Sequence, residues 1–385
     1  MIDTIVLTLP KDMFYIFEPD RFNPSARWVM DDTGYSGSRG FIVSKQNPTP
    51  EELKNGIYKP RLSVTRRFNH TQNIERTLKI ELSLPKLIYN NNFDELTEKD
   101  FDYIVDKLQT ALKSMGVDIF SNLLKIAPVS AIHYSKNIPL TDGTLPFYYL
   151  KRMQEANISD ILDINSTDYR VGHCVKYHTN SYEVVFYDKI EDLKKGATIS
   201  NKRIIDNDNA IQIGLFNTLK QRKFFEVLRM EIRLNKRFKI KSLFNTLNIK
   251  TDLTFQSLFN EDISKKVLLH YLDFIEDRRP KILDYKTKTA FDFACDVVLS
   301  NPHISSKKAL EIVGFKQISD IVSMREMKKI FSKQNSYSWN RIVKEIKKIN
   351  LPKRNSPFWL IRKEIEQFKP LKLVDFESKI YNNYN

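Results

Sequence analysis

Two segments of this chain alternate apolar and polar residues with a period of two. Residues 78–84 read LKIELSL, and residues 228–234 read LRMEIRL. A strict alternation of this kind predicts a β-strand with one face against a core and the other face accessible. The chain is therefore expected to contain a sheet that is covered on one face only.

Other segments before residue 240 also have strand-like patterns. Further strands are predicted at Thr4–Leu9, Arg61–Phe68 and Val129–Ser135, and a hairpin at Val171–Tyr177 and Tyr182–Lys189. A helix is predicted after Thr97, because apolar residues recur at helical spacing from Phe101 to Met115 and Gly116 can end it. This order predicts an α+β fold, an antiparallel sheet with helices on one face.

The pattern changes near residue 240 to successive amphipathic helices. A boundary within Arg237–Asp252 divides the chain into an expected catalytic domain, residues 1–245, and a basic helical domain, residues 246–385. In the second domain, Ser305 or Ser306 is expected to begin a short helix, Gly314 to form a turn, and Ser319 to cap a second helix.

This helix spacing is typical of a helix-turn-helix unit that binds DNA. The basic residues expected to contact DNA are Arg325, Lys328, Lys329 and Lys333. The alternative is an ordinary pair of helices whose lysines are only solvated.

Net charge indicates the class of partner. The chain has 62 Lys and Arg against 47 Asp and Glu, a formal charge of +15, and residues 301–370 hold 16 of the basic and 6 of the acidic residues. Such a surplus favours a polyanion, either nucleic acid or an anionic membrane. No apolar run approaches the ~20 residues of a spanning helix, and the N-terminus lacks the pattern of a signal peptide. We expect a soluble cytoplasmic protein that acts on nucleic acid, not on a membrane.

Known catalytic and metal-binding templates exclude several activities. The two cysteines, Cys174 and Cys295, are too few and too far apart for a disulfide framework or a structural zinc site. The phosphate-loop, dinucleotide-binding, GxSxG, CxxC and HExxH motifs are all absent from the sequence. A nucleotide-fuelled motor and a zinc peptidase are therefore not expected.

Glu81 and Glu231 lie mid-strand on the polar faces of the two alternating segments. Carboxylates held on a rigid sheet are good oxygen ligands for Mg²⁺ or Mn²⁺. The alternative is that both glutamates form ion pairs on an exposed face, Glu81 with Lys79, and Glu231 with Arg229 and Arg233.

Two further strand residues extend this candidate site. The imidazole of His133 could complete a metal site begun by carboxylates, although a single strand histidine is also common in a purely structural role. Tyr187 shares a strand face with Lys189. A phenol is a poor nucleophile unless a cation or metal lies nearby, and Lys189 supplies one positive charge.

Five segments together resemble the filamentous-phage gene II type replication initiators, a family of rolling-circle origin endonucleases. In chain order they are MIDTIVLTLP, KIELSLPKLIYNNN, SAIHYS, VVFYDKIED and VLRMEIRLNKRF, within residues 1–240. Beyond residue 240 the likeness is limited to a basic helical tail. The sequence departs from the family at His133, where the filamentous-phage proteins have a carboxylate and other rolling-circle nucleases have a histidine pair.

The resemblance implies a rolling-circle nuclease-like fold and metal-dependent nicking of one strand of origin DNA. It assigns the nucleophile to Tyr187 with Lys189 beside it, and the Mg²⁺ or Mn²⁺ ligands to Glu81, Glu231 and His133. Attack would leave a 3′-hydroxyl primer and a 5′-phosphotyrosine link, which permits rejoining without ATP. The implied partners are double-stranded origin DNA of a phage or plasmid and a helicase and polymerase of the bacterial host.

Two alternatives remain open at this point. A plasmid-type initiator would use the same chemistry. A non-enzymatic helix-turn-helix regulator would use only the C-terminal region, and would leave Glu81, Tyr187 and Glu231 unexplained. An RNA-binding protein is less favoured, because no strand carries an aromatic RNP-like motif.

Overall fold

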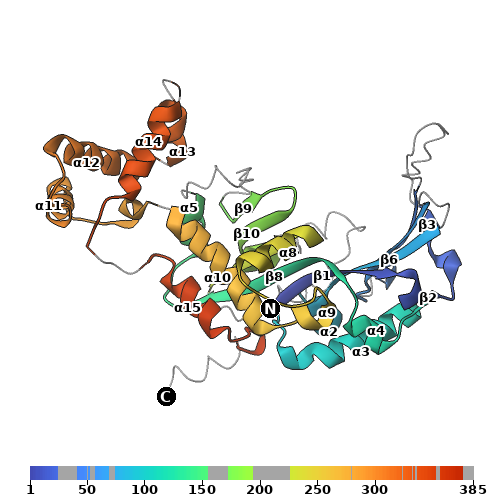
Figure 1. Cartoon of the computed structure of the whole chain (residues 1–385). Coiled ribbons are helices and arrows are strands. Elements are labelled where there is room, and N and C mark those ends of the chain that lie inside the picture. The colour runs from blue at the N-terminus through green and yellow to red at the C-terminus, as the bar shows by residue number, and fades with distance from the viewer. Residues whose placement is uncertain are drawn as a thin grey trace, which may run out of the picture.

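The computed structural model describes residues 1–24, 41–49, 51–52, 57–68, 74–154, 172–193, 226–278, 280–322, 324–331, 333, 336–352 and 356–375. Its main element is an antiparallel sheet of nine strands in the order β3-β4-β5-β6-β1-β8-β11-β10-β9 (Figure 1). These strands are β1 (Ile2–Pro10), β3 (Asn23–Pro24), β4 (Phe41–Gln46), β5 (Arg61–Phe68), β6 (Ile74–Ser83), β8 (Val129–Leu140), β9 (Cys174–His178), β10 (Tyr182–Asp188) and β11 (Glu226–Leu234). A separate small sheet pairs β2 (Tyr15–Ile16) with β7 (Val117–Asp118).

The predicted alternation in the two key strands is confirmed. In β6, Leu78, Ile80 and Leu82 are buried. Lys79 and Glu81 of the same strand point to the other face, where their side chains are close to half exposed. The hairpin of β9 and β10 is also present, although Val171, at its predicted start, lies outside the described residues.

Helices complete the α+β fold. Their bounds are α2 (Leu84–Tyr89), α3 (Phe101–Ser114), α4 (Ser121–Lys125), α5 (Pro146–Gln154), α8 (Arg237–Thr246), α9 (Phe255–Leu258), α10 (Glu261–Arg278), α11 (Ala290–Ser300), α12 (Ser306–Ile321), α13 (Met324–Phe331), α14 (Ser336–Lys347) and α15 (Trp359–Gln367). The predicted helix after Thr97 is α3. Its start is fixed by Asp100, whose carboxylate accepts a hydrogen bond from the Thr97 N–H at 2.7 Å, and Gly116 follows its end at φ +77°. Within the described residues, none of the helices has the length and apolar character needed to cross a membrane.

The helices belong to two separate hydrophobic cores. Helices α8, α10 and α15 pack on the apolar face of β8 and β11, so that Ile240, Leu272 and Ile361 share one core with the sheet (Figure 1). A second core lies among α11, α12, α13 and α14 and includes Phe293 and Trp339. We call residues 281–351 the helical unit. The packing therefore differs from the expected division at residues 245/246, because the inner face of the sheet needs α8, α10 and α15 to cover it.

The predicted turn at Gly314 is wrong. Ser305 does cap α12, since its side chain accepts a hydrogen bond from the Lys308 N–H at 3.3 Å, but the helix then continues through Gly314 to Ile321. Ser319 lies inside this helix and donates its hydroxyl to the Lys316 carbonyl at 2.8 Å. A single glycine costs a helix only about 1 kcal/mol, and the burial of Ile312 and Phe315 on either side offsets that cost.

Candidate active site on the polar face of the sheet

Three residues of β11 place charged side chains on the polar face of the sheet, each opposite at least one polar residue of a neighbouring strand. Because side chains of one face recur every second residue, these positions form a continuous polar surface across three strands. The pairs with β8 and β10 are Arg229 with Asn137 and Tyr187, Glu231 with Ser135 and Val185, and Arg233 with His133 and Glu183.

Glu231 lies at the centre of this surface. Its side chain is buried, and Arg233 donates from Nε to Oε1 at 2.9 Å. The Nδ1 atom of His133 lies 3.5 Å from the same oxygen, and the Tyr187 hydroxyl donates to Oε2 at 3.4 Å. Burial acts to raise the pKa of Glu231, but Arg233 and His133 outweigh it and hold that pKa well below its usual range. Glu231 is therefore a carboxylate at neutral pH.

Tyr187 is partly exposed on the same face. Burial raises the pKa of its phenol well above the usual value; Arg229 opposes this shift, and the charge of Glu231 adds to it. The phenol is therefore neutral until a proton acceptor or additional positive charge reaches it. The hydrogen bond to Glu231 directs its hydroxyl along the sheet toward that carboxylate.

Lys189 follows directly after β10 and is fully buried. Its Nζ lies 5.7 Å from the centre of the Tyr187 ring and 3.7 Å from the carboxylate of Asp192. Among the described residues it has no hydrogen-bond acceptor. Burial, reinforced by the charge of Arg229, lowers the pKa of Lys189 to about 8. Lys189 can therefore change its protonation state near physiological pH, next to the candidate nucleophile.

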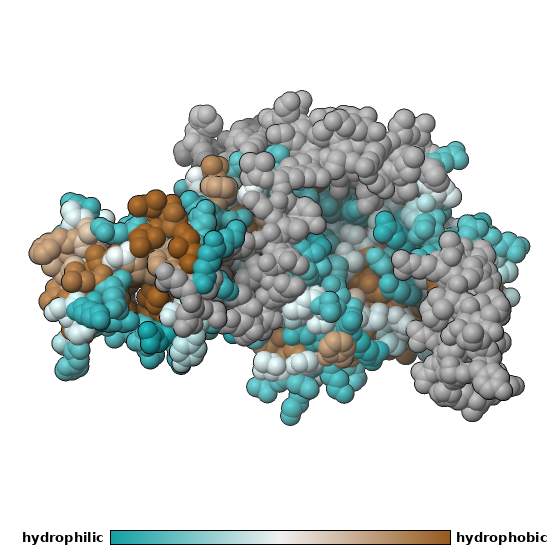
Figure 2. Space-filling view, turned by 90° about the horizontal axis from the view of Figure 1, so that it is seen from above, coloured by the Kyte–Doolittle hydropathy of each residue, from teal (hydrophilic) through white to brown (hydrophobic). Residues whose placement is uncertain are grey.

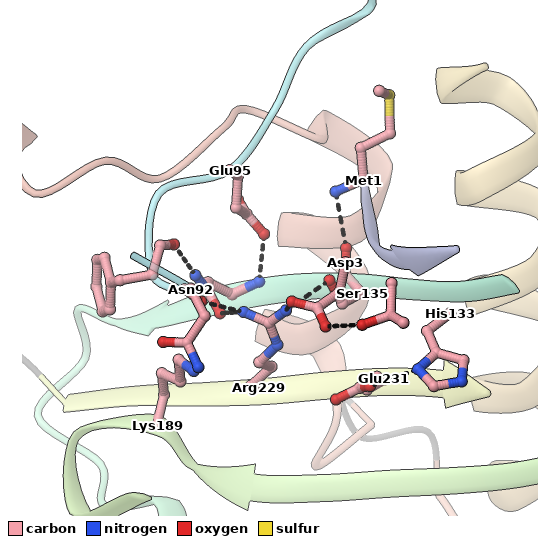
Figure 3. Close-up of polar contacts among 12 residues, drawn as sticks. Met1, Asp3, Asn92, Glu95, His133, Ser135, Lys189, Arg229 and Glu231 are labelled. Atoms are coloured by element: carbon pink, nitrogen blue, oxygen red, sulfur yellow. Dashed lines mark hydrogen bonds and ion pairs between the residues drawn. The ribbon is translucent and has the colours of Figure 1, made fainter. Parts of the chain in front are cut away.

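Arg229 is anchored by contacts that the sequence analysis did not predict (Figure 3). Its Nη2 donates to Asp3 at 2.6 Å and to Ser135 at 3.0 Å, and its Nη1 donates to the Asn92 carbonyl at 2.9 Å. Ser135 had only a weak signal in the sequence: it lies two residues after His133, on the same face of the predicted strand. Asp3 and Asn92 had none, because their approach depends on contacts between distant segments.

A buried charge pair lies next to this cluster, at Lys136 of β8. Glu95 accepts from the ammonium of Lys136 at 2.6 Å and from the Asn137 N–H at 2.6 Å (Figure 3). The same carboxylate accepts from the Leu371 N–H at 2.9 Å, and Lys136 donates to the Lys369 carbonyl at 2.8 Å. The segment after α15 is thus tied to residues that neighbour the candidate site.

The structure brings together four of the five predicted catalytic and metal-binding residues, namely His133, Tyr187, Lys189 and Glu231. Glu81 is not among them. It lies on β6, opposite Val6 of β1, and β1 and β8 separate β6 from β11. Three strand spacings place Glu81 at least about 14 Å from Glu231. Its carboxylate instead lies 3.2 Å from Lys79, the alternative considered for this residue.

The expected metal ligands fit a divalent ion only in part. Among the described residues, no group of three His, Cys, Asp or Glu side chains is arranged to hold a metal. His133 and Glu231 offer two ligands, and Mg²⁺ commonly takes one or two carboxylates and completes its shell with water and substrate phosphate. Arg233, however, already contacts both oxygens of Glu231, and it would have to move away for an ion to bind there.

The predicted DNA contacts lie elsewhere, on the helical unit. Arg325, Lys328 and Lys329 belong to α13, and Lys333 follows that helix. The side chains of Lys329 and Lys333 are exposed. Helix α13 belongs to the second hydrophobic core and is therefore separate from the cluster around Glu231.

Comparison with known proteins does not assign this chain to a family. No family model, no curated protein and no solved structure matches it. Function must therefore be inferred from the cluster around Glu231 and from the basic helical unit.

Proposed function

We propose that this protein is a rolling-circle DNA replication initiator, which nicks one strand of double-stranded origin DNA and rejoins that strand at termination. The observation that carries the proposal is the 3.4 Å contact between the Tyr187 hydroxyl and Glu231, on a rigid sheet face with three cations nearby. A nucleophile, an ionised acceptor and fixed positive charge are the parts that a phosphoryl transfer to a side chain requires.

The proposed reaction is a transesterification. The Tyr187 oxygen attacks the scissile phosphorus, the bond from phosphorus to O3′ breaks, and a 5′-phosphotyrosine link remains. The phenol proton passes through water to the neutral amine of Lys189, and the departing O3′ takes up a proton from water to become the 3′-hydroxyl primer. Glu231 orients the phenol oxygen, and Arg229 and Arg233 offset the negative charge that gathers on the phosphate. Attack of a 3′-hydroxyl on the same link reverses the step and rejoins the strand.

Lys189 has a positioning and proton-transfer role in this proposal. Its ammonium lies 5.7 Å from the ring of Tyr187, and its lowered pKa makes the neutral amine accessible near physiological pH. His133 and Glu231 would hold Mg²⁺ or Mn²⁺. When bound, such an ion would supply the polarisation of the scissile phosphate.

The wider setting follows from the same proposal. The basic surplus of residues 301–370 would hold duplex DNA through its phosphates, so that binding would weaken steeply with salt. Since the sequence carries no helicase motif, a helicase and a polymerase of the bacterial host would extend the primer. We accordingly expect the protein to act in the cytoplasm of that host.

The test is a nicking assay on a supercoiled plasmid that carries the DNA flanking the protein's own coding sequence. Incubation with Mg²⁺ or Mn²⁺ should convert the plasmid to the open circle and leave a protein–DNA adduct that survives denaturant. A matched plasmid without the flanking DNA, and a reaction containing EDTA, are the controls. Supercoiled DNA that stays intact with both metals, although the protein binds it, would refute the proposal.

One observation favours a second candidate function. The helical unit has a hydrophobic core of its own, which would allow it to bind DNA without participation of the sheet. A non-enzymatic regulator would bind a specific duplex and neither nick it nor form an adduct. A plasmid-type initiator, in contrast, would give the same result as the phage type and would differ only in the origin it recognises.

A further inference from the structure

Helix α14 has two chemically different faces. Trp339, Val343 and Ile346 are buried in the second core. Tyr337, Asn340, Arg341 and Lys344 lie at the intervening helical positions, and all four are exposed. Since these four residues recur every three or four positions, they form one stripe along the helix.

The buried face holds this stripe in a fixed orientation. The ring of Trp339 stacks on Phe331, the last residue of α13, with ring centres 6.3 Å apart, and it contacts Phe315 of α12 at 6.4 Å. Aromatic packing on two other helices prevents α14 from turning about its axis. Figure 1 shows α13 and α14 next to each other at the top of the helical unit, with α11 and α12 farther from the sheet.

The exposed stripe has the donors that recognise base edges. Arginine pairs with two acceptors of guanine, and asparagine pairs with two groups of adenine, both in the major groove. Among the described residues, neither Arg341 nor Lys344 has a carboxylate within ion-pair distance, so both charges remain available to a ligand. With 12 residues, α14 is about 18 Å long, and a helix of this size fits the major groove of B-DNA.

Helix α13 is less suited to the same task. It has only 8 residues, Glu326 stands among its exposed positions, and Ile330 is 62% exposed. Figure 2 shows hydrophobic side chains gathered on the upper face of the helical unit beside hydrophilic ones, so its surface is not uniformly basic. A short helix with a mixed acidic and apolar face is less suited than α14 to enter the major groove and read base edges.

We propose that α14 is the helix that reads DNA sequence, through Asn340 and Arg341 in the major groove, while Lys344 and the lysines of α13 contact phosphates. The inference rests on the proposed function in so far as both require duplex DNA. It is separate from the chemistry of Tyr187, because the two surfaces belong to different hydrophobic cores.

In the experiment, the full-length protein is used to select duplexes from a random library of 20-base-pair DNA. The enriched duplexes are then identified by sequencing. Fluorescence anisotropy then compares the enriched duplex with a scrambled duplex of the same composition. The variants are Asn340→Ala and Arg341→Lys, the second of which keeps the charge and removes the two-pronged hydrogen bonding. The control is the double variant Lys328→Ala/Lys329→Ala.

Each α14 variant should lose about tenfold of its preference for the enriched duplex and bind the scrambled duplex as the wild type does. The α13 double variant should weaken binding to both duplexes equally. Undiminished preference in both α14 variants, or a wild-type protein that enriches no duplex, would overturn the inference. A wild-type protein that selects a duplex, and leaves a supercoiled plasmid carrying that duplex intact with both Mg²⁺ and Mn²⁺, would refute the proposed function and leave the role of α14 intact.

Discussion

The Tyr187 hydroxyl donates to one oxygen of Glu231, while the other oxygen accepts a hydrogen bond from Arg233. One buried carboxylate thus links the candidate nucleophile to the partly exposed cation of Arg233. Because Arg233 and His133 hold the pKa of Glu231 well below its usual range, the carboxylate stays ionised and keeps accepting from the phenol. Orientation of the Tyr187 oxygen is therefore independent of pH across the neutral range.

Tyr187→Phe should abolish nicking and the denaturant-resistant adduct, since it removes the only atom that can form the covalent ester. Its folding stability should fall by at most ~1 kcal/mol, the contribution of a typical hydrogen bond. The matched control is Tyr134→Phe, because the Tyr134 hydroxyl is buried on the opposite face and has no hydrogen-bond partner among the described residues. Tyr182→Phe should also keep its activity. An adduct formed by the Tyr187 variant would assign the nucleophile elsewhere.

Glu231→Gln should abolish nicking and lower the free energy of unfolding by about 2 kcal/mol. This is less than the ~3–5 kcal/mol of a fully buried broken pair, because Arg233 is partly exposed to water. Glu81→Gln is the matched control, and it should change neither quantity measurably because its ion pair with Lys79 is exposed. Urea unfolding and the plasmid assay measure the two effects. Loss of nicking in the Glu81 variant would instead support the metal-ligand role predicted for that residue.

Lys189→Met should raise the free energy of unfolding at pH 7, and it should raise that free energy by a smaller amount at pH 10. Burial lowers the pKa of Lys189 from 10.5 to about 8, so below pH 8 the folded protein carries the full cost of a buried charge. That cost is at most about 3 kcal/mol; it shrinks to about 1 kcal/mol at pH 10 and vanishes above pH 10.5. The measurement is the difference in unfolding free energy between variant and wild type at each pH. An equal gain at both pH values for the Lys189 variant would contradict the prediction.

Two deletions should behave differently. Truncation after residue 300 removes α15, whose Ile361 and Ile365 are buried in the sheet core, so the remaining chain should unfold or aggregate. Replacement of residues 281–355 by a short Gly/Ser linker keeps α15 and should leave a folded sheet, as circular dichroism can show. In that variant the salt dependence of DNA binding should flatten by about 0.9 in log–log slope for each phosphate that the helical unit neutralises. An unchanged slope would show that the helical unit does not hold DNA.

The sequence was sufficient to predict which face each side chain of a strand occupies. Alternation placed Glu231 and Tyr187 on polar faces, and both lie there. Alternation does not decide which strands become neighbours, because pairing depends on contacts between distant parts of the chain. For this reason Glu81 was predicted to join Glu231, whereas two strands separate β6 from β11.

The contrast between local pattern and long-range contacts also explains the other differences between prediction and structure. A turn was predicted at Gly314 because glycine is a weak helix former. Its neighbours Ile312 and Phe315 are buried in the second core, however, and their burial favours a continuous α12. Asp3 and Asn92 reach Arg229 only after folding brings three segments together. No local pattern marks residues whose role depends on an arrangement of that kind.

The chain leaves the sheet after α10 and returns to it at α15, and the two crossing points touch. The Ser356 hydroxyl donates to Glu276, and Arg362 forms ion pairs with Asp273 and Glu276. A unit joined to the sheet by a single chain segment can rotate freely about that segment. The helical unit is joined by two segments that contact each other, and this double connection resists such rotation. If the helical unit binds DNA, a torque on that DNA would therefore be transmitted to the sheet. Unwinding of the bound duplex would then exert a force on the strands that hold Tyr187.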